Sequence, residues 1–252
     1  MLQSVLWAAQ GTLFTFVMTA LGAALVFFFS VSPTSRVQRP LLGFSAGVMT
    51  AASVWSLLLP AIDRSEALGL PGWLPAAAGM LLGAVFLSVM DSWLTCLQKG
   101  RFPFPGSRHS ALLAAAITLH NIPEGMAVGL AFALAAGGDN PAGAAALAMG
   151  IGIQNFPEGA AIALPLRQEG LSRRQAFWGG ALSGSVEPLF GILVVLFAAG
   201  VTPLMPWVLS FSAGAMLYVV AEELIPQAHS STGTCGFLLG FLVMMTLDVA
   251  LG

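Results

Sequence analysis

The sequence predicts an all-α polytopic membrane protein with eight transmembrane helices. Of its 252 residues, 57% are hydrophobic and only 8% are charged, which excludes an ordinary soluble domain. Eight apolar runs are long enough to cross a bilayer, so we expect one transmembrane domain over residues 1–252. The expected spans are approximately 5–29, 41–62, 73–97, 110–136, 142–166, 175–200, 203–227 and 233–251.

The basic residues predict the orientation of these spans. No Lys or Arg precedes the first run, so we interpret it as a retained helix and not as a signal peptide. An even number of spans places both termini on one side of the membrane. The loops after spans 1, 3, 5 and 7 contain Arg36, Arg39, Lys99, Arg101, Arg108, Arg167, Arg173 and Arg174, whereas the other loops contain only Arg64. The positive-inside rule therefore predicts that both termini lie on the non-cytoplasmic side.

One polar motif occurs twice, in spans 4 and 5. It reads HNIPEG at residues 120–125 and QNFPEG at residues 154–159. Side chains four residues apart lie on the same face of a helix, so His120 is expected above Glu124. Gln154 is expected above Glu158 in the same way. Imidazole and carboxylate groups at this spacing can bind one metal ion.

Each motif also contains a proline, which has no N–H to donate. Pro123 leaves the carbonyl of Leu119 without its helical partner, and Pro157 does the same for Ile153. Exposed carbonyls in a kinked helix can contribute to a cation site at membrane depth. The alternative is that each proline only bends a helix and each glutamate pairs with a neighbour. It is disfavoured because none of the eight expected spans contains a basic residue.

A second repeat relates spans 2 and 7. FSAGVM at residues 44–49 corresponds to FSAGAM at residues 211–216, and a proline follows each copy further along, at Pro60 and Pro226. The two spans are expected to run in opposite directions. We therefore predict an inverted repeat of spans 1–3 and 6–8 around central spans 4 and 5, an arrangement typical of alternating-access transporters. Alternatively, small-residue patterns recur wherever membrane helices pack closely.

Three carboxylates, those of Glu124, Glu158 and Glu187, are expected near the middle of the bilayer, with His120, Asn121, Gln154, Asn155 and Met49 at similar depth. An isolated charge there costs about 3 kcal/mol or more, so three cost about 10 kcal/mol. A bound divalent cation, or protonation in its absence, removes this cost.

Further ionisable residues lie toward the ends of the spans. Asp63 and Asp248 are expected toward the outside, and Asp91, Glu222, Glu223 and His229 toward the cytoplasm. Together they indicate an acidic entrance and exit for a cation. For each residue alone, a simple solvated carboxylate at a span end is an equal alternative.

The paired motif resembles that of the ZIP family of divalent metal transporters, and Gln154 in the second copy resembles its GufA-like bacterial branch. The resemblance implies that one metal position is lined by Met49, His120, Glu124, Gln154 and Glu158. An adjacent position would be lined by Asn121, Asn155 and Glu187, with Glu124 and Glu158 bridging the two. These ligand types suit Zn²⁺ and neighbouring metals, including Cd²⁺.

The resemblance further implies uptake of Zn²⁺ into the cytoplasm across a bacterial inner membrane, with Cd²⁺, Fe²⁺ or Mn²⁺ as competitors. It implies an elevator-like movement that includes spans 4 and 5, no cofactor other than the transported metal and no nucleic-acid partner. A homodimer is left open. Metal binding is expected to release protons from its ligands. Neutral Asn155 leaves open whether a second ion binds, and only His109 stands where many relatives have a histidine-rich loop.

Two other classes of function remain as alternatives. An intramembrane metalloenzyme could hold zinc with the same residues, but the sequence contains no HExxH motif and only one histidine within a span. A metal sensor would need a soluble signalling domain, and the loops are too short to contain one. Cys96 and Cys235 are far apart in the sequence and indicate neither a disulfide nor a cysteine metal site.

Overall fold

The computed structural model of the chain describes residues 2–29, 35–98, 108–138, 141–198 and 202–251. Side chains are described for the same ranges except residues 35–37, 94–98, 108–117, 120, 198 and 202. Over these ranges the chain is helical and forms no strand, which confirms the all-α prediction.

The helices follow one another with short connections. The first half of the chain forms α1 (Leu2–Ala23), the 3₁₀ turn η1 (Ala24–Phe27), α2 (Ser35–Ala52), the π-helix η2 (Ser53–Leu58), α3 (Leu59–Ala67), α4 (Trp73–Gln98) and α5 (Arg108–Ala136). The second half forms α6 (Pro141–Gln168), α7 (Arg173–Ser183), α8 (Val186–Ala198), the 3₁₀ turn η3 (Thr202–Leu204), α9 (Met205–Val219), the π-helix η4 (Val220–Leu224), α10 (Ile225–Ala228) and α11 (Ser231–Leu251).

Six helical segments of the described chain are long and apolar enough to cross a membrane. They are Leu2–Phe27, Gln38–Ala67, Trp73–Trp93, Arg173–Phe197, Met205–Ala228 and Ser231–Leu251. The chain is therefore a multi-pass membrane protein. The expected spans 110–136 and 142–166 correspond to α5 and α6, which are of spanning length but contain the polar motifs.

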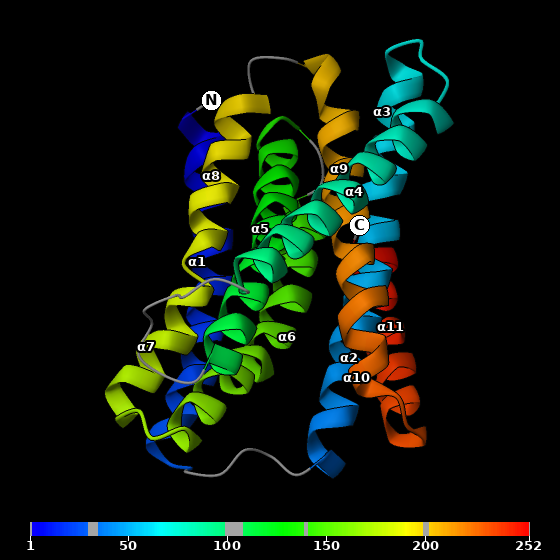
Figure 1. Ribbon diagram of the computed structural model, residues 1–252. Coiled ribbons are helices and arrows are strands. Elements are labelled where there is room, and N and C mark those ends of the chain that lie inside the picture. The colour runs from blue at the N-terminus through cyan, green and yellow to red at the C-terminus, as the bar shows by residue number, and fades with distance from the viewer. Residues whose placement is uncertain (1, 30–34, 99–107, 139–140, 199–201, 252) are drawn as a thin grey trace.

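By their contacts the helices form two groups; in Figure 1, α2 and α11 lie to the right of α5 and α6, and α4 crosses in front of α5. In the α5–α6 group, α1, α5, α6, α7 and α8 pack mainly against one another. In the α2–α11 group, α2 packs along α11 and α4 packs along α9, and η2 and α3 connect the two pairs. Fewer contacts join the groups, chiefly those of α5 with α9 and of α6 with α2 and α11. Each motif-bearing helix thus has neighbours in both groups.

Within each group, backbones approach closely at glycines. A β-carbon at Gly159 of α6 would overlap the backbone carbonyl of Thr19 in α1. In the other group, a β-carbon at Gly47 of α2 would overlap the backbone of Phe237 in α11. Such approaches are typical of tightly associated membrane helices, because small residues let two backbones meet.

At one glycine on the boundary between the groups, the close neighbours are side chains. The atoms nearest to a β-carbon at Gly150 of α6 belong to the side chains of Met244 in α11 and Val48 in α2. A methionine side chain has three rotatable bonds and can adapt to a displaced neighbour. Side chains, more than backbone contacts, therefore fill the boundary at this position.

The expected span 175–200 is interrupted near its middle. Helix α7 ends at Ser183 and α8 begins at Val186, and Pro188 lies in the first turn of α8. Proline cannot donate to the carbonyl four residues earlier, that of Gly184, and its ring clashes with that carbonyl. The interruption places Glu187 at the N-terminal end of α8.

Two π-helices interrupt the spans that contain the FSAG repeat. Segment η2 begins at Ser53, nine residues after Phe44, and η4 begins at Val220, nine residues after Phe211. Each precedes a proline, Pro60 or Pro226, whose missing N–H and bulky ring disturb the α-helical pattern one turn earlier. The two copies of the repeat therefore share an irregularity as well as a sequence.

Candidate metal-binding site

The two polar motifs meet where α5 packs against α6. The Nε2 atom of Gln154 donates a hydrogen bond of 2.5 Å to Oε1 of Glu124. Both side chains are about 1% exposed. The first polar residue of one motif thus contacts the glutamate of the other, a contact between helices that the spacing within a single helix does not predict.

Glu187 forms a second buried contact with the same motifs. Its Oε1 atom accepts hydrogen bonds from Nδ2 of Asn155 at 3.0 Å and from Oγ1 of Thr19 at 3.2 Å. All three side chains are fully buried. The carboxylate of α8 is therefore held between α6 and α1.

The motif glycines explain how these helices come so close. Gly125 follows Glu124, and a β-carbon there would overlap the backbone of Glu187. Gly159 follows Glu158 and meets the backbone of Thr19. Each proline-glutamate-glycine sequence therefore combines a carboxylate with a close helix contact one residue later.

Several polar atoms of this cluster are buried without a hydrogen-bond partner. They are Nδ2 and Oδ1 of Asn121, Oε2 of Glu124, Oε1 of Gln154, Oδ1 of Asn155 and Oε2 of Glu187. Leaving such an atom unsatisfied costs about 1–3 kcal/mol, and more when it is charged. Five of the six are oxygens, the atom type with which carboxylate and amide groups bind metal ions. The donor set therefore fits a divalent cation.

Glu158 differs from the other carboxylates, because its side chain is only half-buried. The carboxylates of Glu158 and Glu187 are close enough to act electrostatically on Glu124. Glu223 of η4 acts on Glu158 in turn. Glu158 thus lies between the buried cluster and an acidic residue of the α2–α11 group.

The remaining predicted ligands are less directly placed. Met49 is 2% exposed and packs within the apolar core, so packing is sufficient to explain its position. His120 lies on α5, but its side chain is outside the described part of the structure. Among the described side chains, no three from His, Cys, Asp and Glu come together closely enough to hold one ion. The buried cluster consists instead of carboxylates alternating with amides.

The two outer acidic residues, Asp63 and Asp248, line one cavity of about 670 Å³. Asp63 is exposed, whereas Asp248 is 8% exposed. The Oδ1 atom of Asp248 accepts a hydrogen bond of 2.6 Å from the hydroxyl of Ser56 in η2, and its Oδ2 atom is buried without a partner. Arg64 also lines this cavity, which is therefore of mixed charge.

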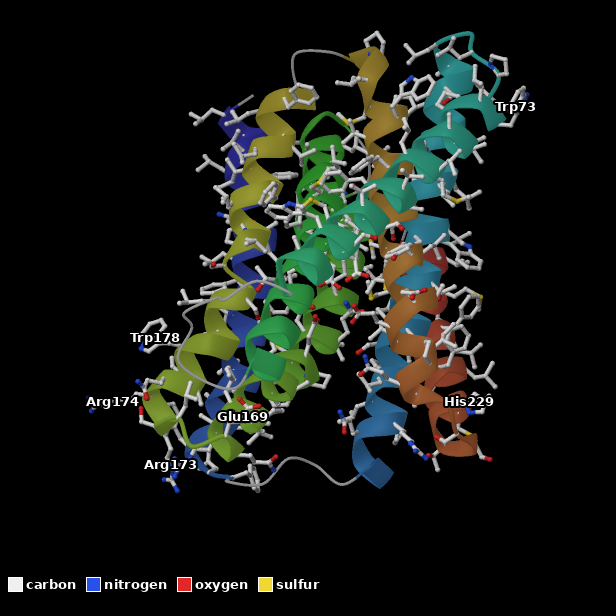
Figure 2. The ribbon with its side chains drawn as sticks, viewed as in Figure 1. Trp73, Glu169, Arg173, Arg174, Trp178 and His229 are labelled. Carbon is white, nitrogen blue, oxygen red and sulfur yellow. The ribbon has the colours of Figure 1, made fainter. Side chains whose placement is uncertain are left out.

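The inner residues are not gathered into one cluster. Asp91 and Glu223 are half-buried, and Glu222 and His229 are exposed. In Figure 2, His229 lies at the same end of the molecule as Arg173 and Arg174, the end predicted to be cytoplasmic. Of these residues, Glu223 acts electrostatically on Glu158, which in turn acts on Glu124 of the buried cluster.

Sequence reasoning missed the polar residues that support the carboxylates. Ser56 is one of two serines, with Ser53, in an apolar run, and no local signal singles it out. Thr19 could have been found, because Thr12, Thr15 and Thr19 recur at the spacing of one helical face in an apolar span. All three are fully buried.

The chain is similar in sequence to known proteins. The family model described as ZIP Zinc transporter matches residues 103–248. Zinc transporter ZIP11 of Xenopus tropicalis is 38% identical, over 98% of each chain. Zinc transporter GufA of Myxococcus xanthus is 38% identical over 86% of this chain and 88% of its own, and zinc transporter ZIPB of Bordetella bronchiseptica is 38% identical over 98% and 82%. The predicted resemblance is confirmed: the chain belongs to the ZIP zinc transporter family and is a membrane transporter, not an enzyme.

Proposed function

We propose that the protein carries Zn²⁺ across a membrane into the cytoplasm through the buried cluster of α5, α6 and α8. The main support is that Glu124 and Glu187 each have one carboxylate oxygen bonded to an amide and the other oxygen buried without a partner. Uncompensated carboxylates at membrane depth cost about 3 kcal/mol each, and a divalent cation would offset this cost. Similar chains named zinc transporters support zinc as the substrate. Cd²⁺, Fe²⁺ and Mn²⁺ are the proposed competitors.

The proposed ligands form two neighbouring positions. Met49, His120, Glu124, Gln154 and Glu158 would line the first, and Asn121, Asn155 and Glu187 the second, with Glu124 and Glu158 shared. Electrostatic interaction of Glu124 with both other glutamates supports a shared arrangement. Asn155 is neutral and adds no negative charge to the second position, which favours weaker binding there.

The proposed topology has eight spans, with α5 and α6 as the central pair and both termini outside the cytoplasm. The matching sequence and matching π-helices of η2 and η4 support an inverted repeat that relates spans 1–3 to spans 6–8. The proposed location is a bacterial inner membrane. Asp63 and Asp248 would attract the cation on the outer side, and Asp91, Glu222, Glu223 and His229 on the inner side.

The proposed movement is a sliding of the α5–α6 group against the α2–α11 group. It is supported by the contrast between backbone contacts at glycines within each group and side-chain contacts at Gly150 on the boundary. Since Glu124, Glu158 and Glu187 all belong to the α5–α6 group, a movement of this kind would carry the carboxylates together. Met49 belongs to the other group and would be left behind.

The test is uptake of ⁶⁵Zn²⁺ into proteoliposomes that contain the purified protein. Wild-type protein should show saturable uptake, and Glu124→Ala and Glu158→Ala should each reduce it to the background of empty liposomes. The reason is that either change removes a carboxylate shared by both proposed metal positions.

Glu66→Ala serves as the matched control, because Glu66 is an exposed glutamate at the end of α3, away from the cluster. It should retain wild-type uptake. Near wild-type uptake by Glu124→Ala or Glu158→Ala, in folded protein of equal amount, would rule out the proposed site. Competition by Cd²⁺, Fe²⁺ and Mn²⁺ in the same assay measures the metal preference.

A further inference from the structure

Helix α1 presents three buried threonines toward the rest of its group. The hydroxyl of Thr12 donates to the carbonyl of Ala8 at 2.7 Å, and that of Thr15 donates to the carbonyl of Thr12 at 3.0 Å. Thr19 reaches two acceptors, the carbonyl of Thr15 at 3.3 Å and Oε1 of Glu187 at 3.2 Å. A hydroxyl has a single proton to donate, and an ionised carboxylate is the stronger acceptor. The Thr19 hydroxyl therefore donates its hydrogen bond to Glu187, and not to the Thr15 carbonyl, when Glu187 is charged.

The position of Thr19 is set by two other helices. Its backbone carbonyl meets Gly159 of α6 so closely that a β-carbon there would overlap it. Its side chain lies against Gly184, at the interruption between α7 and α8, where a β-carbon would stand 2.9 Å from both Cβ and Oγ1 of Thr19. These contacts leave the hydroxyl little freedom to move relative to Glu187, three residues beyond Gly184.

The two donors determine which carboxylate oxygen is free. Thr19 and Asn155 approach the carboxylate of Glu187 from α1 and α6, and both donate to Oε1. The Oε2 atom remains buried without a partner. A carboxylate with both donors on one oxygen is fixed in rotation and presents its other oxygen to whatever binds beside it.

We propose that Thr19 is a positioning residue for Glu187, and that α1 is thereby part of the metal site and sets its affinity for zinc. The inference rests on the proposed function of the buried cluster and adds to it a helix outside residues 103–248, the region that the family model matches. Thr19 and Glu187 belong to the same helix group, so their contact persists while the group moves.

The test compares Thr19→Val, which removes the hydroxyl at nearly constant volume, with Thr19→Ser, which retains it. Thr12→Val is the matched control, because Thr12 is equally buried on the same helix but donates only to backbone carbonyls of α1. Thr19→Val should raise KM for ⁶⁵Zn²⁺ uptake about tenfold, the factor that corresponds to losing a hydrogen bond to a charged group. The kcat should stay within about twofold, because the contact is the same before and after the movement.

Thr19→Ser should restore KM to within about twofold of wild type, and Thr12→Val should leave it unchanged. If Thr19→Val does not fold, Thr19→Ala takes its place, since it also lacks the hydroxyl. Equal KM values for the Thr19 and Thr12 variants would overturn the inference, and so would a failure of Thr19→Ser to restore KM.

A thermodynamic cycle with Glu187→Ala tests whether Thr19 acts through that carboxylate. Calorimetric titration of the purified proteins with Zn²⁺ should show that Thr19→Val weakens binding in the wild-type background and has no further effect beside Glu187→Ala. Additive effects would overturn the inference. The titration measures binding without transport. A wild-type protein that binds zinc but does not transport it would therefore contradict the proposed function, and the cycle would still decide whether Thr19 acts through Glu187.

Discussion

Two glycines inside the helix groups, Gly159 and Gly47, have different neighbours from Gly150 at the boundary between the groups. Inside the groups, glycines such as Gly159 and Gly47 bring two backbones into contact. At the boundary, Gly150 meets the side chain of Met244. Backbone contacts fix two helices in one register, whereas a flexible side chain can repack after a displacement. This difference supports the proposed sliding of one group against the other.

The largest effect is expected from a bulky residue inside a group. Gly159→Val would force α1 away from α6, because its side chain would occupy the position of the Thr19 carbonyl. Overpacking typically costs about 1–3 kcal/mol, and more where the backbone cannot yield, so we expect loss of most folded protein. Size-exclusion chromatography and thermal denaturation of the purified protein measure this loss.

Gly150→Ala is the matched variant at the boundary, where only the side chain of Met244 must move to admit the new methyl group. It should retain the wild-type elution profile and a melting temperature within a few degrees of wild type. If the two variants are equally stable, the contrast between the interior and the boundary is not real.

A covalent link across the boundary should have the next largest effect. Cγ1 of Val48 lies 3.5 Å from a β-carbon built at Gly150, so Val48→Cys and Gly150→Cys would place two thiols within reach of each other. In a background with Cys96 and Cys235 replaced by serine, oxidation should lower zinc uptake about tenfold or more by preventing the movement. A reductant should restore uptake, and each single cysteine should be insensitive to the oxidant. Full uptake by the cross-linked protein would contradict the sliding of one group past the other.

The smallest effect is expected at Met49, the proposed ligand that lies across the boundary from the carboxylates. Met49→Leu preserves the volume of this buried side chain but removes the thioether, a ligand that favours soft metals. We expect KM to rise a few-fold for Zn²⁺ and more for Cd²⁺ in the uptake assay. Met216→Leu, at the matching position of the other FSAG copy and equally buried, should not change the ratio of the two KM values. Equal changes in both variants would mean that Met49 only packs.

Much of the fold followed from composition and local pattern. The apolar runs predicted the helices, since a chain in a bilayer must satisfy its backbone hydrogen bonds within each segment. The interruption at Gly184 and the π-helices were not predicted, although Pro188, Pro60 and Pro226 were visible in the sequence. A proline signals that a regular helix is disturbed, but neighbouring helices decide whether it becomes a kink, a break or a π-turn.

The sequence singled out the carboxylates and amides of the buried cluster but not their pairings. Helical spacing suggested His120 with Glu124 and Gln154 with Glu158, whereas the structure pairs Gln154 with Glu124 and Asn155 with Glu187. Periodicity relates residues of one helix only. Contacts between helices depend on rotation and depth, which small residues and packing set.

By itself, the sequence determined that this is a helical membrane protein of the ZIP family with carboxylates and amides inside apolar segments, because hydrophobic length and a duplicated polar motif are local properties of the chain. The tertiary structure alone decided which oxygens of Glu124 and Glu187 remain without a partner, and that Thr19 of the first helix reaches this cluster. Both depend on how close three helices come, which is set by the glycines that follow the motif glutamates and by the interruption before Glu187.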